Sequence, residues 1–183
     1  MRIYTRRGDQ GETGMLGGER VSKADPRIEV CGALDETSAA LGLARALGLA
    51  EAVDTAVARI QEDLLLAGAE VARSGTMGAR IAAEDVTRLE RAIDTHEAEL
   101  RPLEGFIVPG GAPGPAALHL ARSVCRRAER GLVAAWGQTR EGSSLIAYLN
   151  RLSDLLFVLA RRANALAGAA EVTWGPRDPR SRG

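Results

Sequence analysis

Apolar residues recur every three or four positions over five segments of the 183-residue chain, which is the spacing of an amphipathic α-helix. The pattern predicts five helices, over about 26–47, 51–73, 86–100, 116–136 and 143–167. Asp25 as N-cap and Pro26 at the first helical position predict where the first helix begins, and Gly48 predicts where it ends. Because the links are short, we expect an all-α, five-helix up-and-down bundle.

Several of these helices carry a second row of polar or small residues beside the apolar stripe. The rows are Cys31, Asp35, Ser38 and Gly42; Arg122, Arg126 and Glu129; and Asn150, Asp154 and Phe157. Each row has helical spacing and therefore lies on one face. The arginine row fits either a solvated surface with ion pairs or the face of a cleft. A monomer has no evident use for these rows, so we expect them to be buried against other subunits or a ligand.

Residues 4–23 are the one long segment that does not fit a helix, with five glycines within 8–18. Glycine lets the backbone adopt positive φ and approach a ligand closely, and the interleaved hydroxyls and cations suit a polyphosphate. A flexible N-terminal tail is the alternative. Lys23 is the only lysine among 24 basic residues, and a lysine ammonium is a common partner of phosphate. Neither a P-loop nor a dinucleotide fingerprint is present.

The linker over 102–114 brackets the apolar triplet 106–108 with three prolines and four glycines. Proline gives such a loop a defined shape, so the triplet is either a hydrophobic plug for the bundle or the wall of an apolar pocket. Residues 74–83 are expected to form a loop. His96 falls on the apolar stripe of the third helix, which favours a core or boundary histidine over a ligand.

Composition restricts the class of protein further. With 45% hydrophobic and 26% charged residues the chain is long enough for one domain, and its net charge of zero disfavours nucleic-acid binding. Cys31 and Cys125 match no metal or redox spacing, which predicts buried, reduced thiols in a cytoplasmic protein. No leader and no apolar run of about 20 residues is visible, so no membrane association is expected.

Six sequence blocks together resemble the PduO-type ATP:cob(I)alamin adenosyltransferases. They cover residues 4–14, 20–27, 35–36, 106–111, 121–130 and 148–154, and the resemblance runs from residue 3 to about 174. It implies a homotrimer of five-helix bundles, ferritin-like but without a di-metal site, with active sites between neighbouring subunits. It also implies the reaction, in which cob(I)alamin attacks the 5′ carbon of ATP to give adenosylcobalamin and triphosphate.

The resemblance assigns roles to residues by position. The segment expected to fold over ATP contains Tyr4, Thr5, Arg6, Gly8, Asp9, Gly11, Thr13, Gly14 and the phosphate-binding Lys23. On the helices, Arg126 resembles the arginine at the triphosphate, Glu129 the acidic residue near the nucleoside and its magnesium-linked shell, and Asn150 an asparagine that reaches ATP. Mg²⁺ is expected with ATP and not in a site made by protein alone.

The residues implied for the corrinoid are fewer. Asp35 and Arg122 resemble a pair that bridges subunits near the corrin, and Phe106 resembles the aromatic residue against the lower face of the ring. With Arg126, these three are the implied catalytic residues. The family often has other residues at Cys31, Thr37 and Ser38, which puts corrinoid affinity in question more than the reaction.

The expected organisation is an ATP-binding segment over 1–24, a bundle domain over 25–174 and a disordered tail over 175–183. ATP and a corrinoid are the expected substrates, and a reductase and an adenosylcobalamin-dependent enzyme are the candidate protein partners. An ATP-binding regulatory module without chemistry is the alternative function. A di-metal ferritin-like bundle is disfavoured because the chain has no Glu-x-x-His motif.

Overall fold

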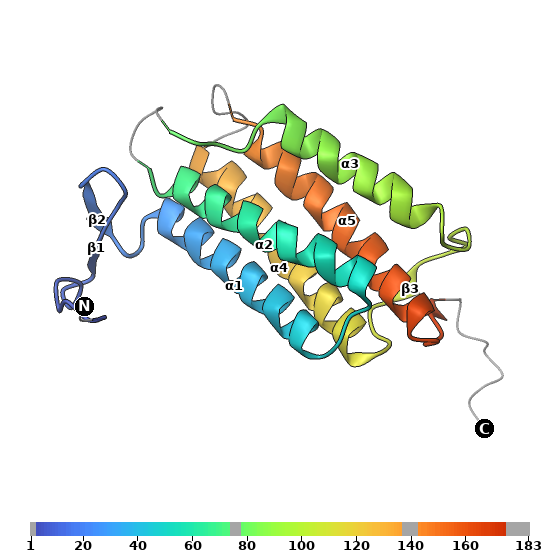
Figure 1. The fold of residues 1–183 in the computed structure, drawn as a ribbon. Coiled ribbons are helices and arrows are strands. Elements are labelled where there is room, and N and C mark those ends of the chain that lie inside the picture. Colours follow the sequence, from blue (N-terminus) through green and yellow to red (C-terminus); the bar gives the residue numbers. More distant parts are fainter. Residues whose placement is uncertain (1–2, 74–77, 137–142, 175–183) are drawn as a thin grey trace.

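A computed structural model of the chain describes residues 3–73, 78–136 and 143–174. Five long helices lie side by side in an up-and-down bundle, and two small sheets lie at its periphery (Figure 1). The helices are α1 (Pro26–Ala46), α2 (Glu51–Val71), α3 (Ala83–Glu97), α4 (Pro113–Trp136) and α5 (Leu145–Leu166). The strands are β1 (Glu12–Gly14), β2 (Arg20–Ser22), β3 (Ile107–Val108) and β4 (Val172–Thr173). The predicted all-α, five-helix bundle is confirmed.

The signals at the helix ends explain the bounds. The Asp25 side chain accepts a hydrogen bond from the backbone N–H of Arg27 at 2.9 Å, as its role as N-cap requires, and Gly48 follows α1 with φ +95°. α3 begins earlier than predicted because the Asp85 carboxylate accepts from the Ala82 N–H at 3.0 Å. α4 also begins earlier, at Pro113, since a proline in the first turn lacks an N–H that would be unpaired there anyway.

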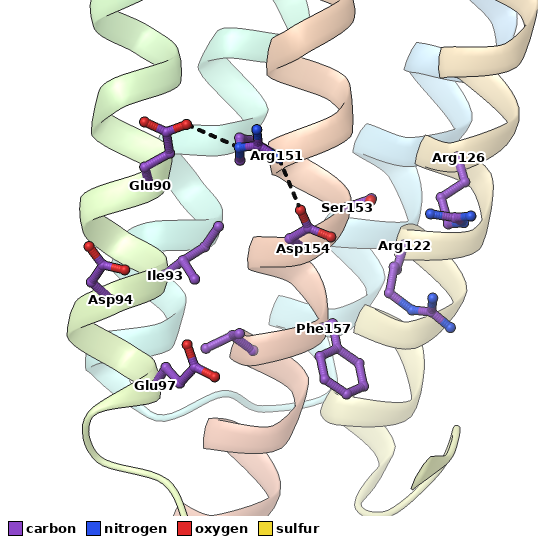
Figure 2. A pocket seen from close by; sticks show the side chains of 11 residues that line it. Glu90, Ile93, Asp94, Glu97, Arg122, Arg126, Arg151, Ser153, Asp154 and Phe157 are labelled. Carbon is purple, nitrogen blue, oxygen red and sulfur yellow. Dashed lines mark hydrogen bonds and ion pairs between the residues drawn. The ribbon is translucent and has the colours of Figure 1, made fainter. Parts of the chain in front are cut away.

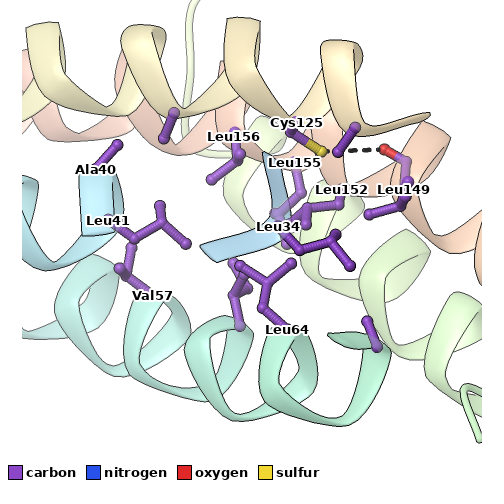
Figure 3. Close-up of a cluster of buried hydrophobic side chains, with 14 of the residues drawn as sticks. Leu34, Ala40, Leu41, Val57, Leu64, Cys125, Leu149, Leu152, Leu155 and Leu156 are labelled. Carbon is purple, nitrogen blue, oxygen red and sulfur yellow. Dashed lines mark hydrogen bonds between the residues drawn. The ribbon is translucent and has the colours of Figure 1, made fainter. Parts of the chain in front are cut away.

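The core is built from the predicted apolar stripes. Leu34, Leu64 and Leu152 meet at the centre, where α1, α2 and α5 come together with α4 (Figure 3). The predicted stripe residues of α1, α2, α4 and α5 are buried except Leu47, which caps the end of α1 and is exposed. On α3 only Leu89 is buried, because α3 packs on α5 with one side and leaves the others to solvent. Each fully buried leucine contributes about 1.5–3 kcal/mol to folding by leaving water.

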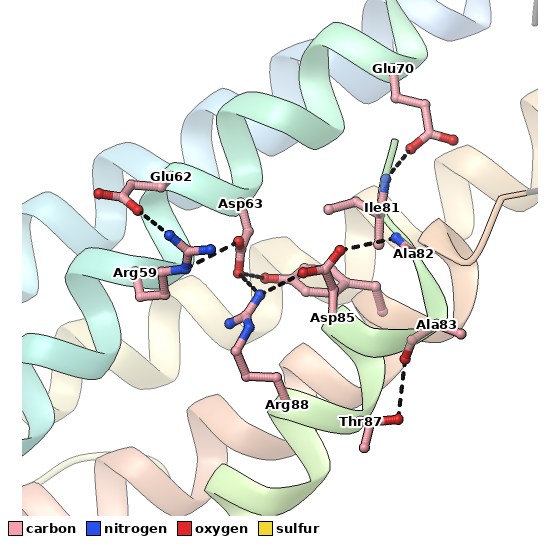
Figure 4. Close-up of polar contacts among 11 residues, drawn as sticks. Arg59, Glu62, Asp63, Glu70, Ile81, Ala82, Ala83, Asp85, Thr87 and Arg88 are labelled. Atoms are coloured by element: carbon pink, nitrogen blue, oxygen red, sulfur yellow. Dashed lines mark hydrogen bonds and ion pairs between the residues drawn. The ribbon is translucent and has the colours of Figure 1, made fainter. Parts of the chain in front are cut away.

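A buried carboxylate joins three helices near one end of the bundle (Figure 4). Asp63 of α2 accepts hydrogen bonds from the Tyr148 hydroxyl of α5 at 2.7 Å and from Arg88 of α3 at 2.8 Å. The carboxylate is almost fully buried. Because removing one partner from a buried ion pair leaves an uncompensated charge, this contact fixes the position of α5 against α2 and α3. Tyr148 lies two residues before Asn150, so the same contact also positions that site residue.

The glycine-rich segment forms a small hairpin, in agreement with the prediction that it is not helical. β1 and β2 pair antiparallel, and the hairpin projects from the bundle beyond the start of α1 (Figure 1). It is attached through the buried Met15 and through a hydrogen bond from the Leu16 N–H to the Ala72 carbonyl at 2.8 Å, at the end of α2. The segment is therefore a folded structure with a fixed base.

The linker after α3 differs from one prediction. β3 pairs antiparallel with β4, and the Phe106 side chain is 79% exposed while Val108 is also exposed. The hydrophobic-plug interpretation is therefore wrong, because the ribbon holds the triplet against the C-terminal strand and not in the core. Cys125 is buried as expected, but Cys31 is only half-buried. His96 is half-buried, as expected for a boundary position.

Across residues 3–73, 78–136 and 143–174 no helix is both long and apolar enough to cross a membrane. The predicted tail over 175–183 and part of the predicted loop over 74–83 lie outside the described residues.

Candidate functional site

A cleft of about 460 Å³ lies between α3, α4 and α5 (Figure 2). It is lined by Glu90, Ile93, Asp94 and Glu97 of α3, Arg122 and Arg126 of α4, and Arg151, Ser153, Asp154, Phe157 and Val158 of α5. Glu90 of α3 pairs with Arg151 of α5 across the opening, while Arg122 and Arg126 lie on the side formed by α4. The cleft can therefore hold a ligand with separate anionic and apolar parts.

Two arginines of α4 lack an acidic partner. Within the described residues, neither Arg122 nor Arg126 forms an ion pair. By contrast, Arg151 of α5 pairs with Glu90 of α3 at 3.0 Å. The Nε of Arg122 is buried and has no hydrogen-bond partner. Burial, and then the charge of Arg126, lower the pKa of Arg122 below its usual range. Since a guanidinium stays protonated in proteins, an anion from outside the chain would stabilise this pair.

Asn150 does not line the cleft, but its side chain bonds residues of two neighbouring positions beside it. Its amide nitrogen donates to Glu129 of α4 at 3.1 Å, and its amide oxygen accepts from Arg151 at 3.0 Å. Arg151 and Glu90 were not among the predicted site residues. Arg151 lies inside the recognised block 148–154, which was a usable signal, whereas nothing in the sequence pairs it with α3.

α4 and α5 run antiparallel along the cleft. From Asn150 and Glu129 the two helices lead past Arg122 to Phe157, whose ring centroid lies 6.2 Å from that of His119. His119 is buried, its Nδ1 has no hydrogen-bond partner, and burial followed by the charge of Arg122 lowers its pKa. It was not predicted, although it lies one turn before Arg122 on the same helical row.

The predicted residues of the N-terminal segment gather around Lys23. A Cβ added at Gly8 would lie 3.3 Å from the Lys23 Nζ, a tight contact that the lysine side chain would have to relieve by a small shift. The Lys23 N–H donates to the Gly11 carbonyl at 2.8 Å, and Gly11 has φ +85°. The structure thus brings Gly8 and Gly11 together with the one lysine.

The other residues of this segment are exposed or lie in the hairpin. Arg6 has a φ of 60° and its guanidinium carbon lies 5.6 Å from the centre of the Tyr4 ring. The Thr5 hydroxyl accepts from the Arg7 N–H at 3.4 Å. Asp9 is exposed, and Thr13 and Gly14 pair with β2 through positions 21 and 20.

Two predicted groupings are not assembled within one chain. No hydrogen bond or ion pair joins the described residues 3–23 to Arg126, Glu129 or Asn150, because the hairpin projects away from α4 and α5. Asp35 is exposed on α1 and, within the described chain, makes no ion pair with Arg122. α4 presents Arg127 to α1, where it pairs with Glu36, and turns Arg122 to the cleft.

Phe106 does not line the cleft. It lies in the linker directly before β3, which is close to the C-terminal end of α5, whereas Asn150 lies near the N-terminal end of that helix. Across the described residues there is no group of three or more His, Cys, Asp or Glu side chains that could hold a metal ion. An all-α bundle with uncompensated arginines in a cleft is the framework of a protein that binds an anionic ligand.

Comparison with known proteins identifies the family. The profile of the cobalamin adenosyltransferase family matches residues 3–163. The chain is 44% identical to the corrinoid adenosyltransferase of Mycobacterium tuberculosis, over 98% of this chain and 96% of the relative. It is 40% identical to the corrinoid adenosyltransferase PduO of Salmonella typhimurium, over 94% of this chain but only 52% of that longer protein.

Solved structures agree. A variant of the PduO-type ATP:corrinoid adenosyltransferase of Lactobacillus reuteri, solved with cobalamin and ATP, superposes with a TM-score of 0.87 at 29% identity, over 94% of this chain and 99% of that one. Another variant of the same enzyme, with ATP, gives a TM-score of 0.86. The chain belongs to the cobalamin adenosyltransferase family.

Proposed function

We infer that the protein transfers the 5′-deoxyadenosyl group of ATP to the cobalt of cob(I)alamin, giving adenosylcobalamin and triphosphate. The observation that carries this function is the uncompensated pair Arg122 and Arg126 in the cleft of a family member. Arg126, which has no acidic partner, would stabilise the negative charge of a bound triphosphate, while Arg122 would remain available to the corrinoid.

The reaction needs charge stabilisation and no proton transfer. The cobalt nucleophile forms a bond to C5′ of ATP while the bond from C5′ to the triphosphate oxygen breaks, and its electron pair leaves with the triphosphate. Lys23 and Arg126 would stabilise that charge as it develops. The rest of the catalysis is orientation, since the corrinoid substrate supplies the nucleophile.

Glu129 and Asn150 would orient the nucleoside part of ATP. Their hydrogen bond of 3.1 Å fixes both side chains before ATP arrives. Mg²⁺ would be held by the phosphates of ATP, with Glu129 in its outer shell. The hairpin residues Gly8 and Gly11 would bring backbone and Lys23 close to the phosphates.

Phe106 would take the lower face of the corrin. An apolar ring at this place excludes water and the base of the cobalamin from the lower axial position of cobalt, and four-coordinate Co(II) is easier to reduce. The ring is 79% exposed, so its burial by the corrinoid would contribute about 1.5–3 kcal/mol to binding. Asp35 and Arg122 would flank the corrin from two subunits.

A homotrimer with active sites between subunits accounts for the separated groups. Within one chain the hairpin projects away from Arg126 and Asn150, and Asp35 lies on another face than Arg122. Leu43 on α1 and Leu120 on α4 are large apolar residues left exposed on the bundle. A neighbouring subunit that covers these two helices would supply the missing half of each site.

The remaining assignments follow from the same function. The segment over 1–24 would act as the ATP-binding segment of the bundle domain over 25–174. A reductase that delivers cob(I)alamin and an enzyme that uses adenosylcobalamin are the expected protein partners. The free thiols of Cys31 and Cys125 are consistent with a reducing, cytoplasmic location.

An anaerobic assay separates this function from an ATP-binding regulatory module. Chemically reduced cobalamin is mixed with Mg-ATP and the protein, and the absorption of adenosylcobalamin is followed. Transfer produces adenosylcobalamin in amounts beyond one equivalent of protein, and Arg126→Ala slows it strongly, while Arg127→Ala, whose partner Glu36 lies on α1, does not. A regulatory module would leave cob(I)alamin without an alkyl group.

A further inference from the structure

We propose that Asn164 and Arg161 of α5 are positioning residues that hold the backbone of the linker and thereby place Phe106 under the corrin. This inference rests on the proposed role of Phe106. A side chain that is 79% exposed cannot be placed by its own packing. The position of the ring must therefore come from the backbone that carries it.

Asn164 holds the end of the linker. Its amide nitrogen donates to the Gly110 carbonyl at 3.0 Å, and its amide oxygen accepts from the Ala112 N–H at 3.0 Å. Asn164 is only 3% exposed, and both ends of its amide are satisfied by the linker, which fixes its rotamer. Gly111 between these partners has φ +108°, and a Cβ there would lie 2.0 Å from the Asn164 oxygen.

Arg161 holds the beginning of the linker and the strand that pairs with it. Its Nη2 donates to the Arg101 carbonyl at 3.0 Å, and its guanidinium bonds both oxygens of Glu171, at 2.9 and 3.2 Å. Arg161 is 4% exposed, so this bidentate pair is shielded from water. Glu171 immediately precedes β4, and Arg161 therefore sets where that strand begins.

β4 in turn fixes the residues next to Phe106. Ile107 pairs with Thr173 and Val108 with Val172, and the Trp174 N–H donates to the Phe106 carbonyl at 2.6 Å. The carbonyl of Phe106 and the two residues that follow it are thus held by the C-terminal strand, while the Phe106 ring remains exposed.

The same face of α5 reaches the cleft. Phe157, Arg161 and Asn164 follow one another at helical spacing, and the Arg161 guanidinium carbon lies 6.0 Å from the centre of the Phe157 ring. One rigid helix therefore carries Asn150 for ATP, Phe157 in the cleft wall and the two anchors of the linker. The distance between the ATP site and Phe106 is set by this helix.

Kinetics from two cobalt states test the inference. Asn164→Ala is expected to lower turnover from cob(II)alamin with a reductant by about 10-fold or more, the effect typical of residues that orient a metal's surroundings. Turnover from chemically reduced cob(I)alamin and binding of Mg-ATP should change less than about 3-fold. The fraction of four-coordinate cob(II)alamin, measured by electron paramagnetic resonance with Mg-ATP present, should fall in parallel.

A double-mutant cycle separates positioning from general stability. If Asn164 acts through Phe106, the double variant Phe106→Ala/Asn164→Ala should match Phe106→Ala within about 2-fold. Val57→Ala is the stability control, because Val57 is buried on α2 away from the linker. Asn164→Asp, which keeps the acceptor for Ala112 and loses the donor to Gly110, gives the same test in a side chain of equal size.

The other outcomes contradict either the positioning role of Asn164 or the proposed function. Equal losses from both cobalt states, or losses of Asn164→Ala and Phe106→Ala that multiply, would contradict the positioning role. So would an Asn164→Ala or Asn164→Asp variant that behaves like Val57→Ala. A wild-type protein that forms no adenosylcobalamin from cob(I)alamin would overturn the proposed function and this inference with it.

Discussion

Phe106 combines an exposed ring with a tightly held backbone. Exposure of a large apolar side chain costs stability that burial elsewhere would recover, about 1.5–3 kcal/mol for a phenylalanine. The linker nonetheless presents it to solvent at 79% exposure. This is the arrangement expected of a ring that becomes buried only when a flat apolar ligand lies on it.

Replacing that ring should separate reduction from transfer. Phe106→Ala is expected to keep Mg-ATP affinity and lose most turnover from cob(II)alamin in the presence of a reducing system. Leu103→Ala is the matched control, because Leu103 is another exposed apolar residue of the same linker. Steady-state rates with both cobalt states check this, and unchanged turnover of Phe106→Ala from cob(II)alamin would rule out the role.

His119 should make stability depend on pH. Burial is the main cause that lowers its pKa below the usual value of 6.5, so the folded protein holds the neutral imidazole. The unfolded chain then binds more protons, and the free energy of unfolding falls as pH drops below 6.5. Urea denaturation at pH 7.5 and 5.5 measures this.

The matched variants are His119→Gln and His96→Gln. His119→Gln should lose part of the difference in unfolding free energy between the two pH values. His96→Gln should change this difference in unfolding free energy less. Burial also lowers the pKa of His96, but this side chain is only half-buried and keeps more contact with water. An unchanged pH dependence in His119→Gln would show that this histidine is not held neutral.

At the scale of elements, helical periodicity was enough to predict the bundle. The stripe Leu145 to Ala163 specified the buried face of α5 because every contact of that face repeats with the helix. The pairing of β3 with β4 was not predictable in the same way. Ile107 and Thr173 are far apart in sequence, two-residue strands have no period, and so Phe106 could be mistaken for a plug.

The site residues were predictable only where helical spacing determines the face on which they lie. Helical spacing placed Arg122, Arg126 and Glu129 on one face, and the structure puts the two arginines in the cleft. Spacing could not show that Arg122 lacks a partner while Arg151 pairs with Glu90 of α3, since that depends on how the helices pack. Nor could it show that the hairpin projects away from this face.

The hairpin should respond to nucleotide as one element. The segment contains Arg6, Arg7 and Arg20, each a residue after which trypsin can cleave, and is attached to the bundle at Met15 and Leu16. Mg-ATP is expected to slow tryptic cleavage at these arginines several-fold, because bound nucleotide covers the segment and stabilises its folded form against opening. Mass spectrometry of the fragments over time measures the rates.

Lys23→Ala is the control for that protection. It removes the one lysine beside Gly8 and should abolish the effect of Mg-ATP while leaving cleavage in its absence nearly unchanged. Equal cleavage of the wild type with and without Mg-ATP would contradict a role of the hairpin in nucleotide binding.

At the scale of the whole molecule, the exposed apolar residues of α1 and α4 should mark the subunit interface. Leu120→Glu is expected to give a monomer without turnover, because a charge replaces a side chain that is 53% exposed in the single chain and that a neighbouring subunit would bury in the proposed trimer. Light scattering coupled to gel filtration gives the mass.

Leu65→Glu makes the same chemical change on α2, where Leu65 is 73% exposed. It should leave both mass and turnover unchanged. A wild-type protein that is monomeric and fully active, or a Leu120→Glu variant that remains trimeric, would contradict active sites between subunits.

Triphosphate is the product that distinguishes adenosyl transfer most directly from ATP hydrolysis. In an anaerobic mixture of the protein, Mg-ATP and chemically reduced cob(I)alamin, ion-exchange chromatography and absorption spectra together count the products. Transfer of the 5′-deoxyadenosyl group predicts one triphosphate for each adenosylcobalamin formed, without matching release of ADP. Consumption of ATP to ADP, or cob(I)alamin that remains without an adenosyl group, would contradict it.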